Sequence, residues 1–314
     1  MRTTATTSDA AGGPARASGT RASRAGASRT GAPRAADASF GAGLRAWRER
    51  RGLSQLALAL EAGVSQRHLS FVESGRAEPS RAMVLRLAEH LDVPLRERNR
   101  LLLAAGYAPV YGERPLTDPA LAAARAAVER VLAGHEPYPA LAVDRHWTLV
   151  AANRAVAPLL AGVAPALLVA PVNVLRLSLH PDGLASRIVN HAEWRAHLLE
   201  RLAQQIAASG DAALVALADE LRDYAPPPAF AADGPPSASS ACAGDGVAGG
   251  VFVPLRLATA SGVLTLLSTT TVFGTPVDVT LAELALECFF PADAETAERL
   301  RATSAGAGAG TAPG

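Results

Sequence analysis

Residues 40–106 carry helix-starting and helix-ending residues at short intervals, and this pattern limits the region to short helices joined by tight turns. Helix starts are marked by capping serines or by proline, at Ser54, Ser65, Pro79-Ser80 and Pro94. Helix ends are marked by glycines, at Gly52, Gly63, Gly75 and Gly106. The spacing predicts five helices that form a compact all-α domain.

In the second half of the chain, strand patterns flank a helical middle. Residues 140–143 and 147–151 have the pattern of two strands, after which Asn153 is expected to begin a helix. Helical patterns cover residues 183–208 and 211–223, strand patterns cover 251–258 and 263–273, and residues 281–289 fit either a strand or a helix. The predicted fold class is α+β, with an N-terminal all-α domain followed by an α+β domain.

Composition sets the domain boundaries, because segments with almost no large apolar side chains cannot form a packed core. These segments divide the chain into a disordered tail at 1–38, a helical domain at 39–110, a connecting helix or linker at 111–137, a second domain at 138–298 that contains a flexible loop at 226–250, and a disordered tail at 299–314.

The charge of the chain is divided unevenly between its two halves. Residues 1–114 carry a net charge of +8 and the remainder carries −7, although the whole chain is at +1. The positive half predicts a phosphate-bearing partner. Cys242 and Cys288 form no paired motif, so we expect neither a disulfide framework nor a metal site, and we expect a cytoplasmic location. No apolar run reaches the roughly 18 residues of a membrane span, so no membrane partner is expected.

Residues 54–80, SQLALALEAGVSQRHLSFVESGRAEPS, resemble the helix-turn-helix of the XRE family of phage-repressor-like regulators. The resemblance has physical reasons, because Ala57 is small where two helices meet and Gly63 permits a left-handed turn. It implies that the chain binds a double-stranded DNA operator as a dimer, with the helix that follows Ser65 in the major groove.

Eight residues match positions where this family contacts DNA. They are Gln55, Ser65, Gln66, Arg67, Ser70, Phe71, Arg76 and Arg81. The resemblance places Gln66, Arg67, Ser70 and Phe71 at base edges and the other side chains at the phosphate backbone or the helix cap. For each, the competing interpretation is a solvated surface residue, and Phe71 departs from the polar residue that is usual at its position. Arg48 and Glu73 match a structural ion pair of the family and are expected to stabilise the domain rather than contact DNA.

Beyond this motif, most of residues 40–295 is similar to MmyB-like regulators. The matching segments include HEPYPALAVDRHWTLVAANRA, NVLRLSLHPDGLASRIVNHAEWRAHLLERL and FGTPVDVTLAELALECFFPAD. The resemblance implies a PAS-like C-terminal domain that binds a small, apolar, fatty-acid-like effector. Polar or aromatic residues set among apolar ones are candidates to line its pocket: Asn153, Asn173, Arg176, His180, Asn190, Trp194 and Arg195. The alternative is that these side chains cap helices or satisfy buried backbone groups.

Two other classes of function stay open at this stage. The helical domain could be a protein-interaction module without specific DNA binding, or the C-terminal cavity could be an enzyme site for a lipid-like substrate. No catalytic residue is predicted, because the serines and histidines show no recognisable arrangement. His191, Glu193 and His197 do not have the i, i+4 spacing of a metal-binding helix. We therefore expect neither an enzyme nor a bound cofactor.

Overall fold

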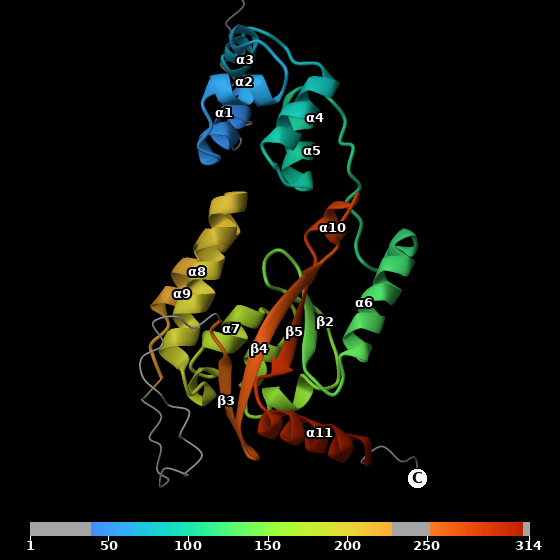
Figure 1. Cartoon of the computed structure of the whole chain (residues 1–314), viewed down its shortest axis with the longest axis vertical. Coiled ribbons are helices and arrows are strands. Elements are labelled where there is room, and N and C mark those ends of the chain that lie inside the picture. Colours follow the sequence, from blue (N-terminus) through green and yellow to red (C-terminus); the bar gives the residue numbers. More distant parts are fainter. Residues whose placement is uncertain (1–38, 228–251, 310–314) are drawn as a thin grey trace, which may run out of the picture. The chain divides into compact units, whose positions relative to one another are not determined.

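The computed structural model describes residues 39–227 and 252–309 of the chain. Its first part is helical (Figure 1) and consists of α1 (Phe40–Arg50), α2 (Gln55–Glu61), α3 (Gln66–Glu73), α4 (Arg81–His90) and α5 (Leu95–Ala104). The predicted five-helix domain is thereby confirmed. The serine caps explain the agreement, because Ser54, Ser65 and Ser80 each accept a hydrogen bond from a backbone N–H of the first helical turn.

The helical domain has a hydrophobic core of its own. Each helix contributes at least one fully buried leucine, and these include Leu44, Leu58, Leu69, Leu87 and Leu102. Gly41 lets α1 approach the end of α3 closely, because a Cβ atom at this position would lie 2.5 Å from the backbone oxygen of Glu73. Burial of these leucines fixes how α2 and α3 cross, and this crossing determines which side chains of α3 face the solvent.

The second part contains a sheet of five strands (Figure 1). They are β1 (Ala140–Val143), β2 (Leu149–Ala152), β3 (Leu255–Thr259), β4 (Gly262–Val272) and β5 (Ala285–Pro291). The order across the sheet is β2-β1-β5-β4-β3, and all neighbours are antiparallel. Strands from both ends of the domain therefore pair at its centre, where β1 lies beside β5.

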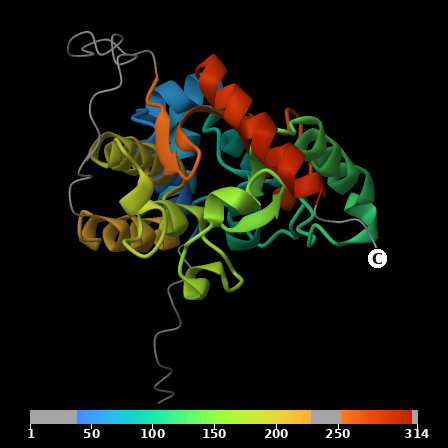
Figure 2. The same ribbon diagram turned by 90° about the horizontal axis from the view of Figure 1, so that it is seen from below.

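Helices of very different lengths surround the sheet. The α-helices are α6 (Ala122–Gly134), α7 (Val174–Leu179), α8 (His191–Ser209), α9 (Ala212–Asp223), α10 (Val279–Ala282) and α11 (Ala294–Ala309), and the short 3-10 helices are η1 (Pro119–Leu121), η2 (Ala157–Leu160), η3 (Pro165–Leu168) and η4 (Ala185–Arg187). Viewed from below (Figure 2), α8 and α9 lie on one side of the domain and α6 lies on the other.

Each face of the sheet has its own apolar cluster, because side chains alternate between the two faces along a strand. On one face Leu257 and Leu266 pack with Leu202 and Leu221 of α8 and α9. On the other face Ala142, Leu286 and Cys288 pack with Val128 and Leu132 of α6. The helical domain and the sheet domain therefore have separate cores, and the predicted α+β class is confirmed.

Several sequence-based boundaries differ from the structure. Asn153 does not begin a helix, because its buried amide instead accepts from the backbone N–H of Ala140 in β1 and donates to the carbonyl oxygen of Leu132 in α6. Residues 299–309, predicted as part of a disordered tail, belong to α11, whose Leu300 is buried against the sheet. The ambiguous segment 281–289 contains the end of α10 and most of β5. The predicted disorder of residues 1–38 lies outside the described residues, as does nearly all of the 226–250 loop.

Within the described ranges, no helix combines the length and the hydropathy needed to cross a membrane.

We predict that Gly41→Ala destabilises the helical domain, although alanine favours helix more than glycine does. The added Cβ would overlap backbone atoms of α3 rather than a movable side chain, and overpacking of this kind costs about 1–3 kcal/mol. Gly134→Ala in α6 is the matched control, because a Cβ there meets nothing within 4 Å. Urea unfolding of both variants checks the prediction, and equal midpoints for the two would contradict it.

Candidate nucleic-acid interface and ligand cavity

One side of α3 is buried and the other carries polar side chains into solvent. Leu69 and Val72 are almost fully buried, whereas Gln66 and Arg67 are exposed and Ser70 is half-buried. A helix with a polar exposed face at its N-terminal end is the element that fits the major groove of DNA. The sequence therefore presents the predicted recognition residues on a helix whose opposite face is fixed by packing.

A buried ion pair holds the end of α3 against α1. Arg48 Nε donates to Glu73 Oε1 at 2.7 Å and Arg48 Nη2 donates to Glu73 Oε2 at 3.0 Å, as the resemblance implied for these two residues. The side chain of Glu73 is 0% exposed and that of Arg48 is 10% exposed. Arg48 also donates through Nη1 to the carbonyl oxygen of Leu53, which ties the pair to the turn before α2.

Glu73 is the acceptor that the cluster shares. Gln55 Nε2 donates to Glu73 Oε2 at 2.8 Å, and Arg45 Nε lies 3.5 Å from the same oxygen. Burial raises the pKa of the Glu73 carboxyl, but hydrogen bonds from Arg48 and Gln55 together with the nearby positive charges outweigh burial, so the pKa lies below its ordinary value. The carboxylate therefore stays ionised at neutral pH and keeps its partners.

Seven of the eight residues predicted to contact DNA, all except the half-buried Ser70, fall into two groups. Gln66, Arg67, Arg76 and Arg81 are exposed, and the described residues provide none of these arginines with an acidic partner. Three others already have partners within the domain. The Gln55 amide bonds to Glu73, the Ser65 hydroxyl caps α3, and the half-buried Phe71 ring lies 5.4 Å from the Arg67 guanidinium.

The sheet domain contains an apolar cavity of about 110 Å³ between the sheet and helices α7 and α8. All five strands contribute to its wall. The lining is mostly leucine, with two tryptophans, Trp147 and Trp194, and two serines, Ser178 and Ser268. A predominantly apolar cavity with a few polar groups is typical of a small-molecule site. We call this space the inner cavity.

The charged side chains that line the inner cavity are Arg201 of α8 and Glu287 of β5, and they form an ion pair. Arg201 Nη2 donates to Glu287 Oε1 at 2.5 Å and Nη1 donates to Oε2 at 3.1 Å. Thr270 accepts a hydrogen bond from Arg201 and donates one to Glu287 at 2.9 Å. The Arg201 guanidinium lies 4.6 Å from the ring centroid of Trp147. The side chain of Glu287 is 5% exposed and that of Arg201 is 27% exposed, so the glutamate is buried and the arginine is only partly buried.

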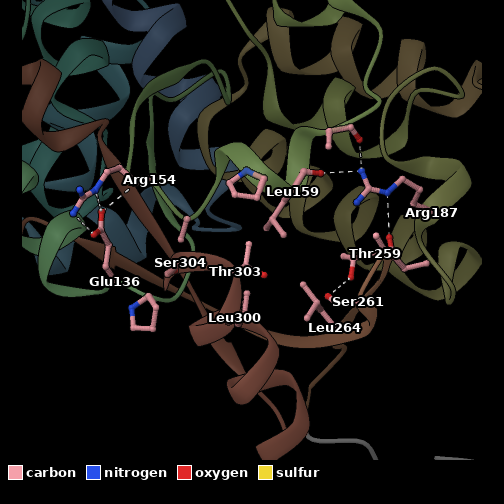
Figure 3. A pocket seen from close by; sticks show the side chains of 16 residues that line it. Glu136, Arg154, Leu159, Arg187, Thr259, Ser261, Leu264, Leu300, Thr303 and Ser304 are labelled. Carbon is pink, nitrogen blue, oxygen red and sulfur yellow. Dashed lines mark hydrogen bonds and ion pairs between the residues drawn. The ribbon is translucent and has the colours of Figure 1, made fainter. Parts of the chain in front are cut away.

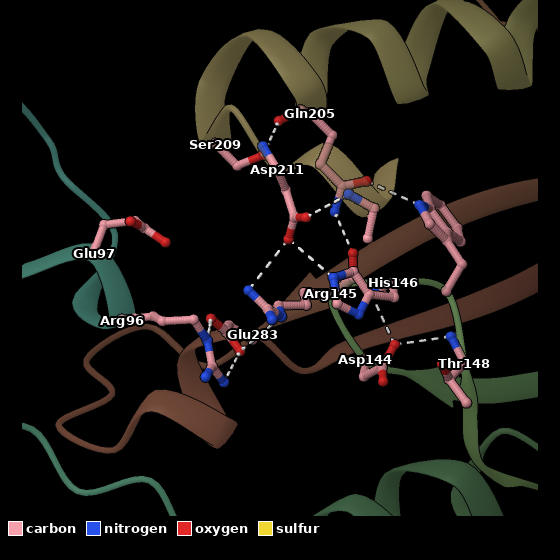
Figure 4. Close-up of polar contacts among 12 residues, drawn as sticks. Arg96, Glu97, Asp144, Arg145, His146, Thr148, Gln205, Ser209, Asp211 and Glu283 are labelled. Carbon is pink, nitrogen blue, oxygen red and sulfur yellow. Dashed lines mark hydrogen bonds and ion pairs between the residues drawn. The ribbon is translucent and has the colours of Figure 1, made fainter. Parts of the chain in front are cut away.

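A network of polar contacts fixes the turn between β1 and β2, next to the inner cavity (Figure 4). Asp144 Oδ1 accepts from the backbone N–H groups of His146 and Thr148, both at 2.8 Å. Asp211, the N-cap of α9, has one carboxylate oxygen 2.9 Å from His146 Nε2 and 3.2 Å from Arg145 Nη1. Burial raises the pKa of Asp211, but these contacts and a hydrogen bond from the backbone N–H of Ala213 outweigh burial and keep the pKa below its usual value.

Trp147 ends this turn with a φ angle of 65°, a left-handed conformation that is rare for a bulky residue. Its indole N–H donates to Gln205 Oε1 at 2.8 Å, and Gln205 Nε2 donates to the carbonyl oxygen of Arg145 at 3.0 Å. These hydrogen bonds fix the orientation of the indole ring in the cavity wall.

Of the seven residues predicted to line a ligand pocket, the structure brings only Trp194 to the inner cavity, where its indole N–H donates to Ser178. The other six have structural partners instead. Asn173 caps α7, Arg176 forms a double hydrogen bond with Glu220, and Arg195 donates to carbonyl oxygens at the end of α9. Asn153 and Asn190 bond to backbone groups, and His180 accepts from the backbone N–H of Asp182.

Sequence reasoning missed Trp147, Ser178, Arg201, Ser268 and Glu287. A signal was present for Glu287, which is a lone acid in an apolar strand whose neighbours alternate between the two faces. Arg201 gave no signal, because its distance in the sequence from Glu287 hides the pairing.

A second pocket, a groove of about 960 Å³, lies in the same domain (Figure 3). We call it the outer groove. It is lined by Arg187, by the Glu136–Arg154 ion pair and by Leu159, Leu264 and Leu300. Arg187 donates to the carbonyl oxygens of Leu159, Ala161 and Ala258, and burial lowers its pKa from the ordinary value. Leu159 also lines the inner cavity, so the two spaces share one side chain.

Comparisons with known proteins agree with this division into two parts. Residues 44–98 match a family model described as helix-turn-helix, and residues 124–302 match the model of the MmyB-like transcription regulator ligand binding domain. A search of curated proteins found no match.

Two solved structures are similar to part of this chain. The restriction-modification controller protein C.AhdI from Aeromonas hydrophila is 37% identical over 20% of this chain and 94% of its own, with a TM-score of 0.19. A helix-turn-helix family transcriptional regulator from Vibrio cholerae is 27% identical over 21% of this chain, with a TM-score of 0.19. This chain covers only 36% of the Vibrio protein.

We predict that Arg48→Ala lowers the stability of the helical domain by about 3–5 kcal/mol, because it leaves the buried Glu73 carboxylate without its main partner. The matched control is Arg100→Ala, which removes an exposed ion pair with Glu97 in the same domain and should cost less than about 1 kcal/mol. Thermal unfolding of both variants gives the comparison. Unchanged stability in Arg48→Ala would show that the pair contributes little.

Proposed function

The chain belongs to the family of MmyB-like transcription regulators, and on that premise we propose that it binds a specific DNA operator through α3 and a small apolar ligand in its inner cavity. That it is a DNA-binding transcriptional regulator follows from its two matched domains. The sequence specificity, the ligand and the dimer are the parts that we propose.

One observation carries the proposal that α3 binds a specific DNA sequence. The exposed side of α3 presents Gln66 and Arg67 beside each other, while Leu69 and Val72 on its buried side fix the helix. Glutamine can pair with the edge of adenine and arginine with the edge of guanine in the major groove. Arg76 and Arg81 follow α3 in the sequence and are exposed, so they are suited to contact phosphates.

The inner cavity supports the proposal for a ligand. Its wall is mostly leucine, and its polar groups are few and held in place by hydrogen bonds, as in sites where a few polar groups orient an apolar ligand. The resemblance to MmyB-like regulators suggests a fatty-acid-like molecule. We propose that the ligand changes DNA affinity by stabilising one of two arrangements of a homodimer, whose two recognition helices would read sites about 34 Å apart.

We predict that the double variant Gln66→Ala, Arg67→Ala loses selectivity between its operator and unrelated DNA, while its thermal stability stays unchanged. The operator is first selected from a random DNA pool, and binding is then measured over a range of salt concentrations. If Arg67 also contacts the DNA backbone, the slope of the logarithm of affinity against the logarithm of salt concentration should become shallower by about one phosphate contact.

The control is Gln204→Ala, Arg130→Ala, which removes the same residue types and the same charge from exposed positions on α8 and α6. Undiminished selectivity in the α3 variant would refute the proposed reading of DNA. Binding that depends little on salt would favour a protein-interaction module instead. The mass of the complex in solution tests the dimer, for which two chains per operator are expected.

We also predict that the purified full-length protein carries a small apolar molecule that native mass spectrometry detects. Ser268→Leu should reduce its retention, because the larger side chain fills part of the inner cavity. Ser261→Leu, at an exposed position of the outer groove, is the matched control. Equal retention in both variants would place the molecule elsewhere, and a chemically altered molecule would favour an enzyme.

A further inference from the structure

We infer that the outer groove is a second ligand site, which takes an organic monoanion with an apolar body and binds its acidic group at Arg187. This inference goes beyond the proposed function, because the ligand proposed above occupies the inner cavity. It rests on the charge of the outer groove, on the hydrogen bonds of Arg187 and on the apolar side chains beside it.

The outer groove has one positive charge in excess among the described residues that line it. The ionisable side chains of its wall are Glu136, Arg154 and Arg187. Arg154 Nη2 donates to Glu136 Oε2 at 2.8 Å, so these two charges neutralise each other. Arg187 forms no ion pair with any carboxylate of the described residues. The wall therefore favours an anionic ligand over a neutral or a cationic one.

The guanidinium of Arg187 is held in place and still has donors to offer. Nε donates to the carbonyl oxygen of Ala258 at 3.1 Å, and Nη1 donates to those of Leu159 and Ala161 at 3.0 and 2.7 Å. An arginine has five N–H groups, so the two on Nη2 remain, and they make no hydrogen bond within the described residues. In Figure 3 this nitrogen is turned toward the space that Leu159 and Leu264 border. A carboxylate oxygen can accept from it without breaking an existing hydrogen bond.

The surroundings of Arg187 increase the gain from binding an anion. The side chain is half-buried, and burial lowers the pKa of its guanidinium from the ordinary value. A partly desolvated cation that is surrounded by carbonyl dipoles interacts more strongly with an added negative charge than an arginine in open solvent does. Because three hydrogen bonds already fix the side chain, a ligand does not have to order it on binding.

The rest of the wall suits an apolar body. Leu159, Leu264 and Leu300 line the outer groove together with several alanines and prolines. The volume of about 960 Å³ lies in the range of roughly 300–1,000 Å³ that is typical of ligand sites, whereas the inner cavity of about 110 Å³ is smaller. The outer groove therefore has room for a ligand body that the inner cavity does not accommodate.

The test uses isothermal titration calorimetry of the full-length protein with 1-naphthoate, 1-naphthamide and formate. Naphthoate and naphthamide have nearly the same size and shape and differ in charge, whereas formate has the charge without the apolar body. We expect naphthoate to bind about tenfold or more tightly than naphthamide, because a hydrogen bond between two charged groups is stronger than one to a neutral acceptor. Formate should bind at least about tenfold more weakly than naphthoate, because it buries little apolar surface.

Arg187→Gln should remove the preference, so that naphthoate binds no more tightly than naphthamide. The matched control is Arg195→Gln. Arg195 is also half-buried and donates to backbone carbonyl oxygens, and it lines neither the outer groove nor the inner cavity. The preference for naphthoate should therefore stay unchanged in this control.

Ser261→Glu keeps the test decisive if Arg187→Gln unfolds, and a melting curve for each variant identifies that case. Ser261 is exposed in the turn between β3 and β4 and lines the outer groove, so a carboxylate there adds a negative charge while all hydrogen bonds of Arg187 remain. We expect Ser261→Glu to weaken the binding of naphthoate about tenfold. Ser261→Gln, which has a neutral side chain of the same size, should weaken it much less.

Equal binding of naphthoate and naphthamide to the unmodified protein would overturn the inference, as would an unchanged preference in a folded Arg187→Gln variant. Loss of naphthoate binding in Ser268→Leu, together with unchanged binding in Ser261→Glu, would place the anion in the inner cavity and overturn the inference as well. The molecule proposed for the inner cavity is tested separately by its retention in mass spectrometry, so the two proposals can fail independently.

Discussion

The buried ion pair between Arg48 and Glu73 is the interaction on which the candidate DNA interface depends. An ionised carboxylate with a fully buried side chain is unfavourable unless its oxygens are hydrogen-bonded, and Arg48 and Gln55 together satisfy both of them. Because Glu73 is the last residue of α3 and Arg48 lies in α1, the pair fixes the C-terminal end of the recognition helix. Gln66 and Arg67 lie in the first turn of the same helix, so their backbone positions are fixed together with that end. The stability of the domain and its presentation of Gln66 and Arg67 thus have one physical origin.

The helical domain could be predicted almost completely from the sequence, because the residues that start and end its helices act locally. A capping serine and a terminating glycine act within one helical turn, and the structure places Ser54, Ser65 and Ser80 as caps. The extent of α11 could not be predicted in this way, because its Ala- and Gly-rich sequence has weak helical periodicity. Its helical conformation is coupled to the packing of Leu300 against the sheet, which is a tertiary effect.

The candidate ligand site shows the same division between local and long-range information. Polar residues in apolar surroundings were chosen as ligand contacts, yet Asn153, Asn173 and Arg195 bond to backbone groups close to them in the fold. Such groups must be satisfied in any folded chain, so their presence alone does not identify a site. The cavity wall depends on side chains brought together by the order of strands in the sheet. Glu287 and Arg201 meet across 86 positions of sequence, and only the three-dimensional fold reveals this pairing.

Both domains contain an arginine–glutamate pair with the same arrangement of hydrogen bonds, and the pair has a different role in each domain. In each, an arginine donates through two nitrogens to a buried glutamate, and a neutral side chain, Gln55 or Thr270, supplies a further hydrogen bond to the carboxylate. All 30 basic residues of the chain are arginine, whose planar fork matches both carboxylate oxygens at once, whereas a lysine acts as a single point charge. In the helical domain the pair is buried between helices and stabilises the domain that carries the candidate DNA interface. In the sheet domain it forms part of a cavity wall, where the Arg201 guanidinium also lies over the ring of Trp147.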